Sequence, residues 1–304
     1  MGVITTSSFA RMMFPGINKI YGNAYNKHKP EWPQVFEKSK ATNAAFEEEV
    51  GVTSFGLAQV KTEGGGITYD DMSQAFTQRY THITYGLGFI ITRETYEDNQ
   101  YAALGLRKAT ALAFSMQQTR EIVCYNILNR AFSNSYTYAD GKELCATDHP
   151  NKSGGTWSNE LATASDISES AIEQACIDIN DFTNDRGLII NIQPQKLIIP
   201  VELETEAVRL LYSELRPGSA ENDINANKYL GRFPEGYFVS HYLTDPDAWF
   251  IQTNCPDGLK YKERRADAFD TDNDFDTENA KFKATTRYSV GVTDPRCIFG
   301  SPGA

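Results

Sequence analysis

The chain has 304 residues, of which 40% are hydrophobic and 23% charged. These values lie near the averages of globular proteins, which excludes a peptide, a disordered chain and a fibrous rod. The formal net charge of −11 argues against a protein that mainly holds phosphate groups, because that affinity comes from clustered Lys and Arg.

The cysteines and the apolar stretches indicate in which compartment the protein is made and whether it enters a membrane. The five cysteines form no C-x-x-C pair, which is typical of free thiols in a reducing compartment. The first residues lack the features of a signal peptide, and no window approaches the roughly 18 to 20 apolar residues of a membrane span. The sequence therefore predicts cytosolic synthesis and no membrane partner.

Residues 1–50 predict an extended arm. They mix Gly, Pro and aromatic residues with little periodicity, as in Phe14-Pro15-Gly16 and Lys29-Pro30-Glu31-Trp32-Pro33. Such a segment has no core of its own, so we expect it to dock on something else.

Residues 51–92 carry strand signals. Two apolar runs, Val52 to Lys61 and Ile67 to Tyr69, flank a glycine-rich turn and predict a hairpin with a flexible tip. The turn consists of Thr62, Glu63, Gly64, Gly65 and Gly66. Farther on, large side chains alternate with smaller ones, which predicts a strand with one buried face. These side chains are Ile83, Tyr85, Leu87, Phe89 and Ile91.

The strongest helix signal opens near Thr92 or Thr95 and runs to about Phe132 without a Pro. At 1.5 Å per residue this helix would be roughly 50 to 55 Å long. Apolar residues at steps of three, four or seven predict one buried stripe, made of Leu106, Ala109, Ala113, Met116, Val123, Ile127 and Ala131. The polar residues are expected elsewhere on the helix: Arg107, Gln117, Gln118, Arg120, Glu121 and Arg130.

Residues 135–165 read as a loop, and the stretch after them as a compact α/β unit. A helix is expected from Asp166 or Ser168 to Gly187, with Ile172, Ala175, Ile179 and Phe182 at helical spacing. Two short strands follow, Leu188 to Ile192 and Lys196 to Ile199. After Pro200 a second helix carries Ala207, Leu210, Leu211 and Leu215 and stops at Pro217-Gly218.

Two further strand patterns complete the chain. Tyr237 to Leu243 and Trp249 to Thr253 flank Thr244-Asp245-Pro246-Asp247 and predict a hairpin. The clearest strand alternation comes last, with one face made of Phe282, Ala284, Thr286, Tyr288, Val290 and Val292. We expect this strand to join a sheet that begins much earlier in the chain.

Local catalytic and metal-binding motifs are largely missing. The sequence has no G-x-S-x-G, P-loop, H-E-x-x-H or G-x-G-x-x-G motif. Cys145, Asp148 and His149 could ligate a metal, but no second Cys or His pair lies nearby, so a polar loop is favoured over zinc. The acidic run from Asp270 to Glu278 has Phe275 and Lys281 where a calcium loop needs Gly and Glu, which favours a solvated loop. No cofactor is predicted.

The histidines and one basic cluster are given structural interpretations. His28, His82, His149 and His241 are scattered, and none has a nucleophile at an informative spacing. One short basic cluster also occurs, for which a solvated face or ion pairs between subunits are favoured over phosphate binding. It consists of Lys260, Lys262, Arg264 and Arg265.

In the order of these elements, the chain resembles the major capsid proteins of tailed bacteriophages with the HK97 fold, and among them the Mu-type major head subunits. Two stretches carry the likeness: Gln195 to Glu204 with Ala207 and Leu210-Leu211, and Arg287 to Val292 before Asp294-Pro295. The resemblance implies an α+β fold with these parts: N-terminal arm, 1–50; E-loop hairpin, 51–92; P domain with spine helix, 93–165; A domain, 166–260; closing P-domain strand and tail, 261–304.

The resemblance also implies a function. The chain would assemble with itself into pentamers and hexamers of an icosahedral shell enclosing dsDNA without sequence-specific binding, in the virion, after assembly in the bacterial cytoplasm. A portal, a separate scaffolding protein and in some cases a decoration protein would be partners. Assembly roles would fall on the loop tip, Thr62 to Gly66, and on the stripe of the long helix. Lys61 and Asn279 have the residue types of a cross-link known in one branch, but no motif assigns it.

Two alternatives stay open on the sequence. One is an encapsulin-like nanocompartment shell, which shares the architecture and would need a cargo enzyme. The other is a cytosolic enzyme with a site near Asp148 and His149. The enzyme would form a small oligomer with a ligand pocket, whereas the capsid interpretation makes the chain a structural protein and no enzyme.

Overall fold

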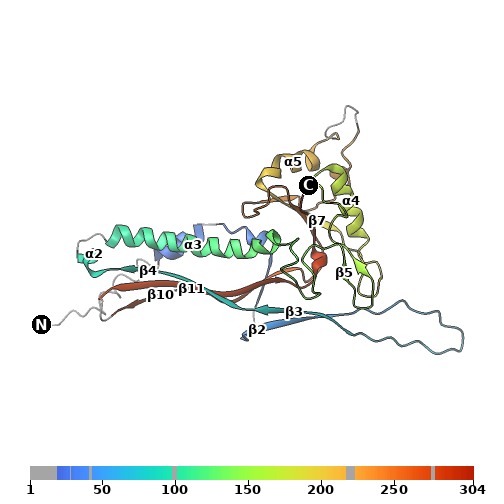
Figure 1. Cartoon of the computed structure of the whole chain (residues 1–304), viewed down its shortest axis with the longest axis horizontal. Coiled ribbons are helices and arrows are strands. Elements are labelled where there is room, and N and C mark those ends of the chain that lie inside the picture. The colour runs from blue at the N-terminus through green and yellow to red at the C-terminus, as the bar shows by residue number, and fades with distance from the viewer. Residues whose placement is uncertain (1–18, 28, 41–42, 98–100, 217–222, 275–277) are drawn as a thin grey trace.

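In the computed structural model, a long helix lies along a four-stranded sheet (Figure 1). The helix is α3, Tyr101–Asn129, and the sheet has the order β1-β10-β11-β4. β10, Leu259–Asn273, and β11, Ala280–Val292, form a long antiparallel hairpin. β4, Ile83–Ile91, is antiparallel to β11, and β1, Glu37–Lys40, is parallel to β10. The last predicted strand thus joins a sheet begun early, as expected.

The structure describes all residues except 1–18, 28, 41–42, 98–100, 217–222 and 275–277, and it describes only the backbone of 96–97 and 101–104. His28, the first part of the predicted arm, the expected helix stop at Pro217-Gly218 and the middle of the acidic run lie outside the described residues. The solvated loop predicted for the acidic run is wrong at its start, because Asp270 to Asn273 belong to β10.

The long helix is divided and its buried face is wider than predicted. A short α2, Arg93–Glu97, precedes α3. Ala109, Ala113 and Met116 are buried as expected, whereas Leu106 is 39% exposed and lies off the buried face. Val123 and Ile127 are half-buried. The expectation for three polar residues is wrong, because Gln117, Arg120 and Glu121 are buried. Other parts of the chain cover this side of the helix.

A two-stranded hairpin extends from this sheet, but not where its strands were predicted. β2, Phe46–Val52, pairs antiparallel with β3, Gln74–Thr81. Residues 53–73 between them contain no strand, so the expected strands at 52–61 and 67–69 are wrong. Figure 1 shows this segment, here called the distal loop (residues 53–73), projecting away from the rest of the molecule. Its apolar side chains find no partner strand within the described chain.

β4 is an edge strand, and its predicted buried face is buried only in part. Ile91 is 3% exposed, whereas Ile83 and Leu87 are 54% and 51% exposed. β11 lies inside the sheet and follows its prediction more closely, because Phe282, Ala284 and Tyr288 are buried. The difference arises because β11 has a neighbouring strand on both sides and β4 on only one.

A second four-stranded sheet has the order β12-β9-β7-β8. Its strands are β7, Pro194–Pro200; β8, Tyr237–Ser240; β9, Trp249–Thr253; and β12, Ile298–Ser301. β7 lies between β8 and β9, parallel to β8 and antiparallel to β9. The predicted hairpin of 237–243 with 249–253 is therefore wrong, and residues 188–192 form no strand.

Short elements surround the second sheet. α4, Glu169–Asn180, begins at Ser168, whose side chain accepts a hydrogen bond from the amide of Ala171. The helix after Pro200 is α5, Glu204–Tyr212, but Leu215 lies beyond it and is 48% exposed. The remaining elements are α6, Ala226–Leu230; β5, His149–Pro150; β6, Thr156–Trp157; and the 3₁₀ turns Trp32–Gln34, Val201–Leu203 and Pro295–Cys297.

The second sheet separates two hydrophobic clusters. Ile198 of β7 and Phe250 of β9 belong to the cluster shared with the first sheet and α3. Leu197 and Ile199 of β7 belong to the cluster on the opposite face, under α4 and α5. Burial on both faces explains why β7 reads as a continuous apolar run without alternation.

Candidate assembly surfaces

The described part of the arm packs against its own chain. Residues 19–27 are helical, and the Tyr21 ring stacks on Phe269 of β10 with 4.7 Å between centroids. The Tyr25 hydroxyl contacts both Asp267 and Arg120, and Arg120 Nη2 lies 2.6 Å from Asp267 Oδ2. The expectation that the arm docks only on another molecule is wrong for these residues, because buried polar groups of α3 and β10 hold them.

Glu121 of α3 holds the next part of the arm. Its two carboxylate oxygens accept hydrogen bonds from the backbone amides of Glu31 and Trp32, each at 2.9 Å. Burial raises the pKa of Glu121 to about 7, although the amide donors act in the opposite direction. Glu31 in turn accepts from the backbone amide of His241 at 3.1 Å and contacts its Nδ1 at 2.6 Å. The arm segment therefore connects α3 to the second sheet.

The base of the β2–β3 hairpin rests on the first sheet through charged groups. Glu47 and Glu49 of β2 face Lys260 and Lys262 of β10, with Lys262 Nζ 3.1 Å from Glu47 Oε2 and Lys260 Nζ 2.9 Å from Glu49 Oε2. Lys260 and Lys262 are buried. The predicted solvated face or intersubunit pairing is therefore wrong for these two lysines, which form ion pairs within the chain.

The charge of Glu49 is stabilised by this arrangement. Burial alone would raise its pKa, but hydrogen bonds from Lys260, Lys262 and Thr293 outweigh burial and lower the pKa to about 2. Sequence reasoning missed this site. The available signal was the i, i+2 spacing of Glu47 and Glu49 on one strand pattern and of Lys260 and Lys262 on another, because such residues share one face.

A second contact holds the distal loop. Arg186 Nη2 lies 3.3 Å from Asp70 Oδ1 and donates to the carbonyl oxygen of Asp71 at 2.8 Å. Asp70 also accepts from the amide of Gly56 at 2.7 Å, which joins the two sides of the loop. These hydrogen bonds lower the pKa of Asp70. The loop is thereby fixed relative to the residues that follow α4.

The distal loop exposes apolar side chains. At its tip the amide of Gly65 donates to the carbonyl oxygen of Thr62 at 3.0 Å, and Gly64 has a φ of +76°, which favours glycine. Around this turn lie large side chains in solvent: Phe55, Leu57, Val60, Ile67 and Tyr69, with exposures of 55%, 74%, 94%, 67% and 91%. Exposed apolar groups at this density are typical of interaction surfaces.

A second exposed apolar group lies on the second-sheet unit. Val208 and Tyr212 of α5 and Tyr229 and Leu230 of α6 are 39%, 51%, 64% and 64% exposed. The opposite face of α5 is buried through Ala207, Leu210 and Leu211. The helix thus has apolar residues on two faces, of which the described part of the chain covers only one.

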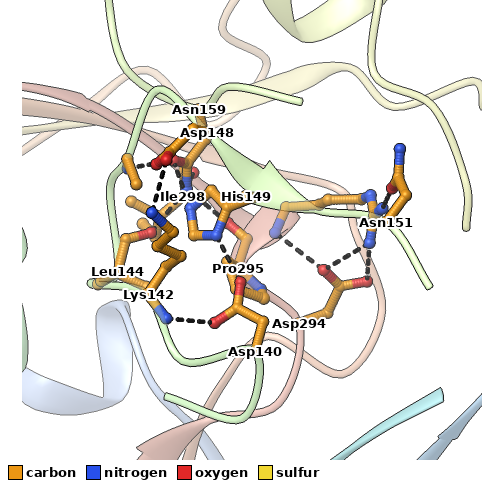
Figure 2. A network of polar contacts seen from close by, with 12 residues as sticks. Asp140, Lys142, Leu144, Asp148, His149, Asn151, Asn159, Asp294, Pro295 and Ile298 are labelled. Carbon is orange, nitrogen blue, oxygen red and sulfur yellow. Dashed lines mark hydrogen bonds and ion pairs between the residues drawn. The ribbon is translucent and has the colours of Figure 1, made fainter. Parts of the chain in front are cut away.

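The candidate enzyme residues Asp148 and His149 lie in two different polar contacts (Figure 2). His149 is fully buried, its Nδ1 lies 2.6 Å from Asp140 Oδ2, and its Nε2 lies 3.0 Å from Asn159 Oδ1. Asp148 instead forms a surface ion pair with Lys142, with 2.5 Å between the charged atoms. The two candidate residues thus have different partners and different surroundings.

Asn159 explains why this polar cluster is buried. Its Nδ2 donates to the carbonyl oxygens of Leu144, Pro295 and Ile298, at 2.7, 3.1 and 3.1 Å. Figure 2 shows these contacts between Asn159 and two distant parts of the chain, the loop that contains Leu144 and the segment from Pro295 to Ile298 at the start of β12. The cluster therefore connects distant parts of the chain, and His149 completes its hydrogen bonding.

The described residues contain neither a metal-ligand cluster nor a helix suited to a membrane. Within them, no group of three or more His, Cys, Asp or Glu side chains is arranged to hold a metal ion. Cys145 is buried, and burial raises the pKa of its thiol. Among the helices of the described part, none combines the length and apolar character needed to cross a bilayer.

Comparison with protein families identifies the chain. A family model described as phage capsid protein matches residues 75–300, more than half of the chain. The chain belongs to the phage capsid protein family. No curated protein matches this capsid protein.

Solved structures share its fold at low sequence identity. The virus-like particle from Pyrococcus furiosus has a TM-score of 0.56 and 11% identity, with 95% of this chain and 98% of that chain covered. The Mycobacterium phage Patience chain has a TM-score of 0.55 and 12% identity, with coverages of 98% and 88%. The procapsid of bacteriophage JBD30 has a TM-score of 0.52 and 13% identity, with coverages of 97% and 75%. The capsid protein therefore has the predicted HK97-like α+β fold.

Proposed function

We propose that this structural capsid protein forms pentamers and hexamers of an icosahedral shell that encloses a dsDNA genome. The exposed apolar distal loop carries this proposal. A loop with Leu57, Val60 and Tyr69 at 74%, 94% and 91% exposure has no core of its own. It gains burial by lying across a neighbouring copy, and such head-to-tail contacts close into rings.

The proposal assigns roles to the parts of the chain. Residues 1–50 are the N-terminal arm, 51–92 the E-loop with its tip at Thr62 to Gly66, 93–165 the P domain with the spine helix, 166–260 the A domain, and 261–304 the closing strand and tail. The tip and the helix stripe act in assembly. The likeness to the virus-like particle concerns the fold alone and does not favour a nanocompartment over a phage head.

The proposed partners follow from the same role. A portal and a separate scaffolding protein act during assembly in the host cytoplasm, and a decoration protein is a further candidate partner of the virion. The net charge of −11 supports weak, non-specific contact with the enclosed DNA. A net basic set of lumen-facing residues, mapped in assembled shells, would contradict that part.

Negative-stain electron microscopy tests the function. The purified chain is imaged when expressed alone and when expressed with a neighbouring scaffold-like gene. Closed shells, or rings of five and six subunits, are the expected result. A discrete monomer or dimer in both preparations overturns the proposal and returns attention to Asp148 and His149.

A further inference from the structure

His82 lies at the junction of the hairpin and the first sheet. It is the single residue between β3, which pairs with β2, and β4, which pairs with β11. Only 5% of the residue is exposed. A change in how this side chain is held therefore acts where the hairpin strand enters the sheet.

The two ring nitrogens of His82 are held unequally. Nδ1 lies 3.0 Å from the Ser289 hydroxyl of β11, which either donates or accepts. Nε2 is buried without a hydrogen-bond partner and lies 3.4 Å from Glu47 Oε1 of β2. A neutral imidazole donates from only one of its nitrogens, whereas an imidazolium donates from both and carries a positive charge. Protonation therefore creates a charged donor facing a carboxylate.

Charged groups of both signs surround the base of the hairpin. The hydrogen-bonded cluster beside His82 contains the carboxylates of Glu47, Glu49 and Asp257 and the ammonium groups of Lys260 and Lys262. Around this cluster, Arg287 of β11 donates from Nε to the His82 carbonyl oxygen at 3.4 Å, and Tyr80 of β3 hydrogen-bonds Thr293, the residue after β11, at 2.6 Å.

We propose that His82 is a pH-sensitive hinge lock that fastens the base of the β2–β3 hairpin to the first sheet when it is protonated. Acidification adds a charged contact from His82 to Glu47 and joins the hairpin to β11 through one side chain. Without that proton the charged contact is absent, and the hairpin base is held by the lysine ion pairs and by hydrogen bonds such as that of Tyr80 with Thr293. The consequence for shells rests on the proposed function, but the lock itself belongs to the single chain.

Amide hydrogen exchange on the full-length chain tests the lock at pH 5.5 and pH 8, between which an ordinary histidine changes charge. Glu121, whose pKa is about 7, also changes charge in this range, but it lies on α3 under the arm and not in the hairpin. Light scattering first establishes that the assembly state is the same at both values. After correction for intrinsic exchange rates, protection of the β2 and β3 amides is expected to be roughly tenfold higher at pH 5.5, a factor equivalent to about 1.4 kcal/mol.

Matched variants separate the lock from other titrations. His82→Gln keeps a neutral polar side chain, and its protection is expected to be the same at both pH values. His241→Gln removes a histidine far from the hairpin and should keep the tenfold change. Glu47→Gln keeps His82 and removes the carboxylate that faces it. This variant should also lose the tenfold difference in protection, and it tests the lock if His82→Gln does not fold. No pH change in the unaltered chain, or a full change in His82→Gln and Glu47→Gln, overturns the proposal. These outcomes do not depend on whether shells form.

Discussion

Glu49 Oε2 in β2 lies 2.9 Å from Lys260 Nζ in β10, although 211 residues separate them in the sequence. A two-stranded hairpin is marginally stable by itself, so this contact and its neighbours determine how the hairpin lies on the body. Charged groups make much of this attachment, beside the buried ring of Tyr80. Its strength therefore depends on pH and ionic strength.

The first prediction concerns Glu49→Gln. Loss of the charge leaves two buried lysines with fewer carboxylate partners, which is expected to cost about 1–3 kcal/mol of unfolding free energy at pH 7. Because the pKa of Glu49 is lowered from 4.5 to about 2, its contribution is present above pH 4.5 and is lost as pH falls toward 2. Urea unfolding at several pH values measures both effects.

Glu48→Gln is the matched control, since Glu48 is exposed on the same strand. It should leave stability at pH 7 nearly unchanged. Equal losses in the two variants would show that the ion pairs with Lys260 and Lys262 do not hold the hairpin.

The second prediction concerns Glu121→Ala. Two backbone amides lose their acceptor, and at about 1–3 kcal/mol each the variant should unfold more easily by about 2–4 kcal/mol. The pKa of Glu121 is raised from 4.5 to about 7, so its contribution is complete below pH 4.5 and declines as pH rises through 7. The loss should therefore be larger at pH 5 than at pH 8. Arg107→Ala, an exposed site on the same helix, should show neither effect.

The third prediction separates folding from assembly. Val60 is 94% exposed in the distal loop, so Val60→Asp should leave the melting temperature of the subunit unchanged and reduce the yield of shells in electron micrographs. Ile189→Asp is the control, because Ile189 is also exposed, at 74%, but lies outside the loop. Normal shells from Val60→Asp and from a deletion of residues 62–66 would contradict the assembly role of the loop.

The fourth prediction concerns the long helix. Met116 is 4% exposed in the middle of α3, and a proline there removes a helix hydrogen bond at a cost of about 3 kcal/mol or more. Met116→Pro should abolish shells and expose the subunit to proteolysis. Met116→Leu keeps the volume and the helix, and it should assemble normally.

The fifth prediction distinguishes a structural His149 from a catalytic one. Removing the imidazole takes a hydrogen-bond partner from each of two buried oxygens, Asp140 Oδ2 and Asn159 Oδ1, at a cost of about 1–3 kcal/mol, so His149→Ala should lose stability and assembly together. Asp148→Ala removes only a surface contact and should change neither. A variant at His149 that assembles and melts like the unaltered chain would refute the structural role, and thermal unfolding with electron microscopy provides the comparison.

The elements with strong periodic patterns could be predicted from the sequence. β11 alternates because one of its faces lies against α3, and α4 begins at Ser168 because that side chain caps the helix. The buried part of the helix stripe at Ala109, Ala113 and Met116 follows for the same reason. In each case the pattern reflects burial against one neighbouring layer.

The candidate surfaces were harder to predict because they depend on contacts between distant residues. Arg120 and Glu121 read as solvent-facing, yet both are buried under the arm, which satisfies their charges. The strands expected at 52–61 failed because side-chain type alone does not supply a partner strand. The pairing of Lys260 with Glu49 required knowledge that β2 crosses β10, which no local pattern contains.

The pairing of β4 with β11 also has a consequence for synthesis. β4 consists of residues 83–91, and its only partner strand in the described sheet is made of residues 280–292. A ribosome must therefore add nearly two hundred further residues before β4 finds its place, at about 5–20 residues per second. A nascent chain cannot complete this sheet early, so β4 stays without its partner strand, and open to pairing with other chains, until synthesis is nearly finished.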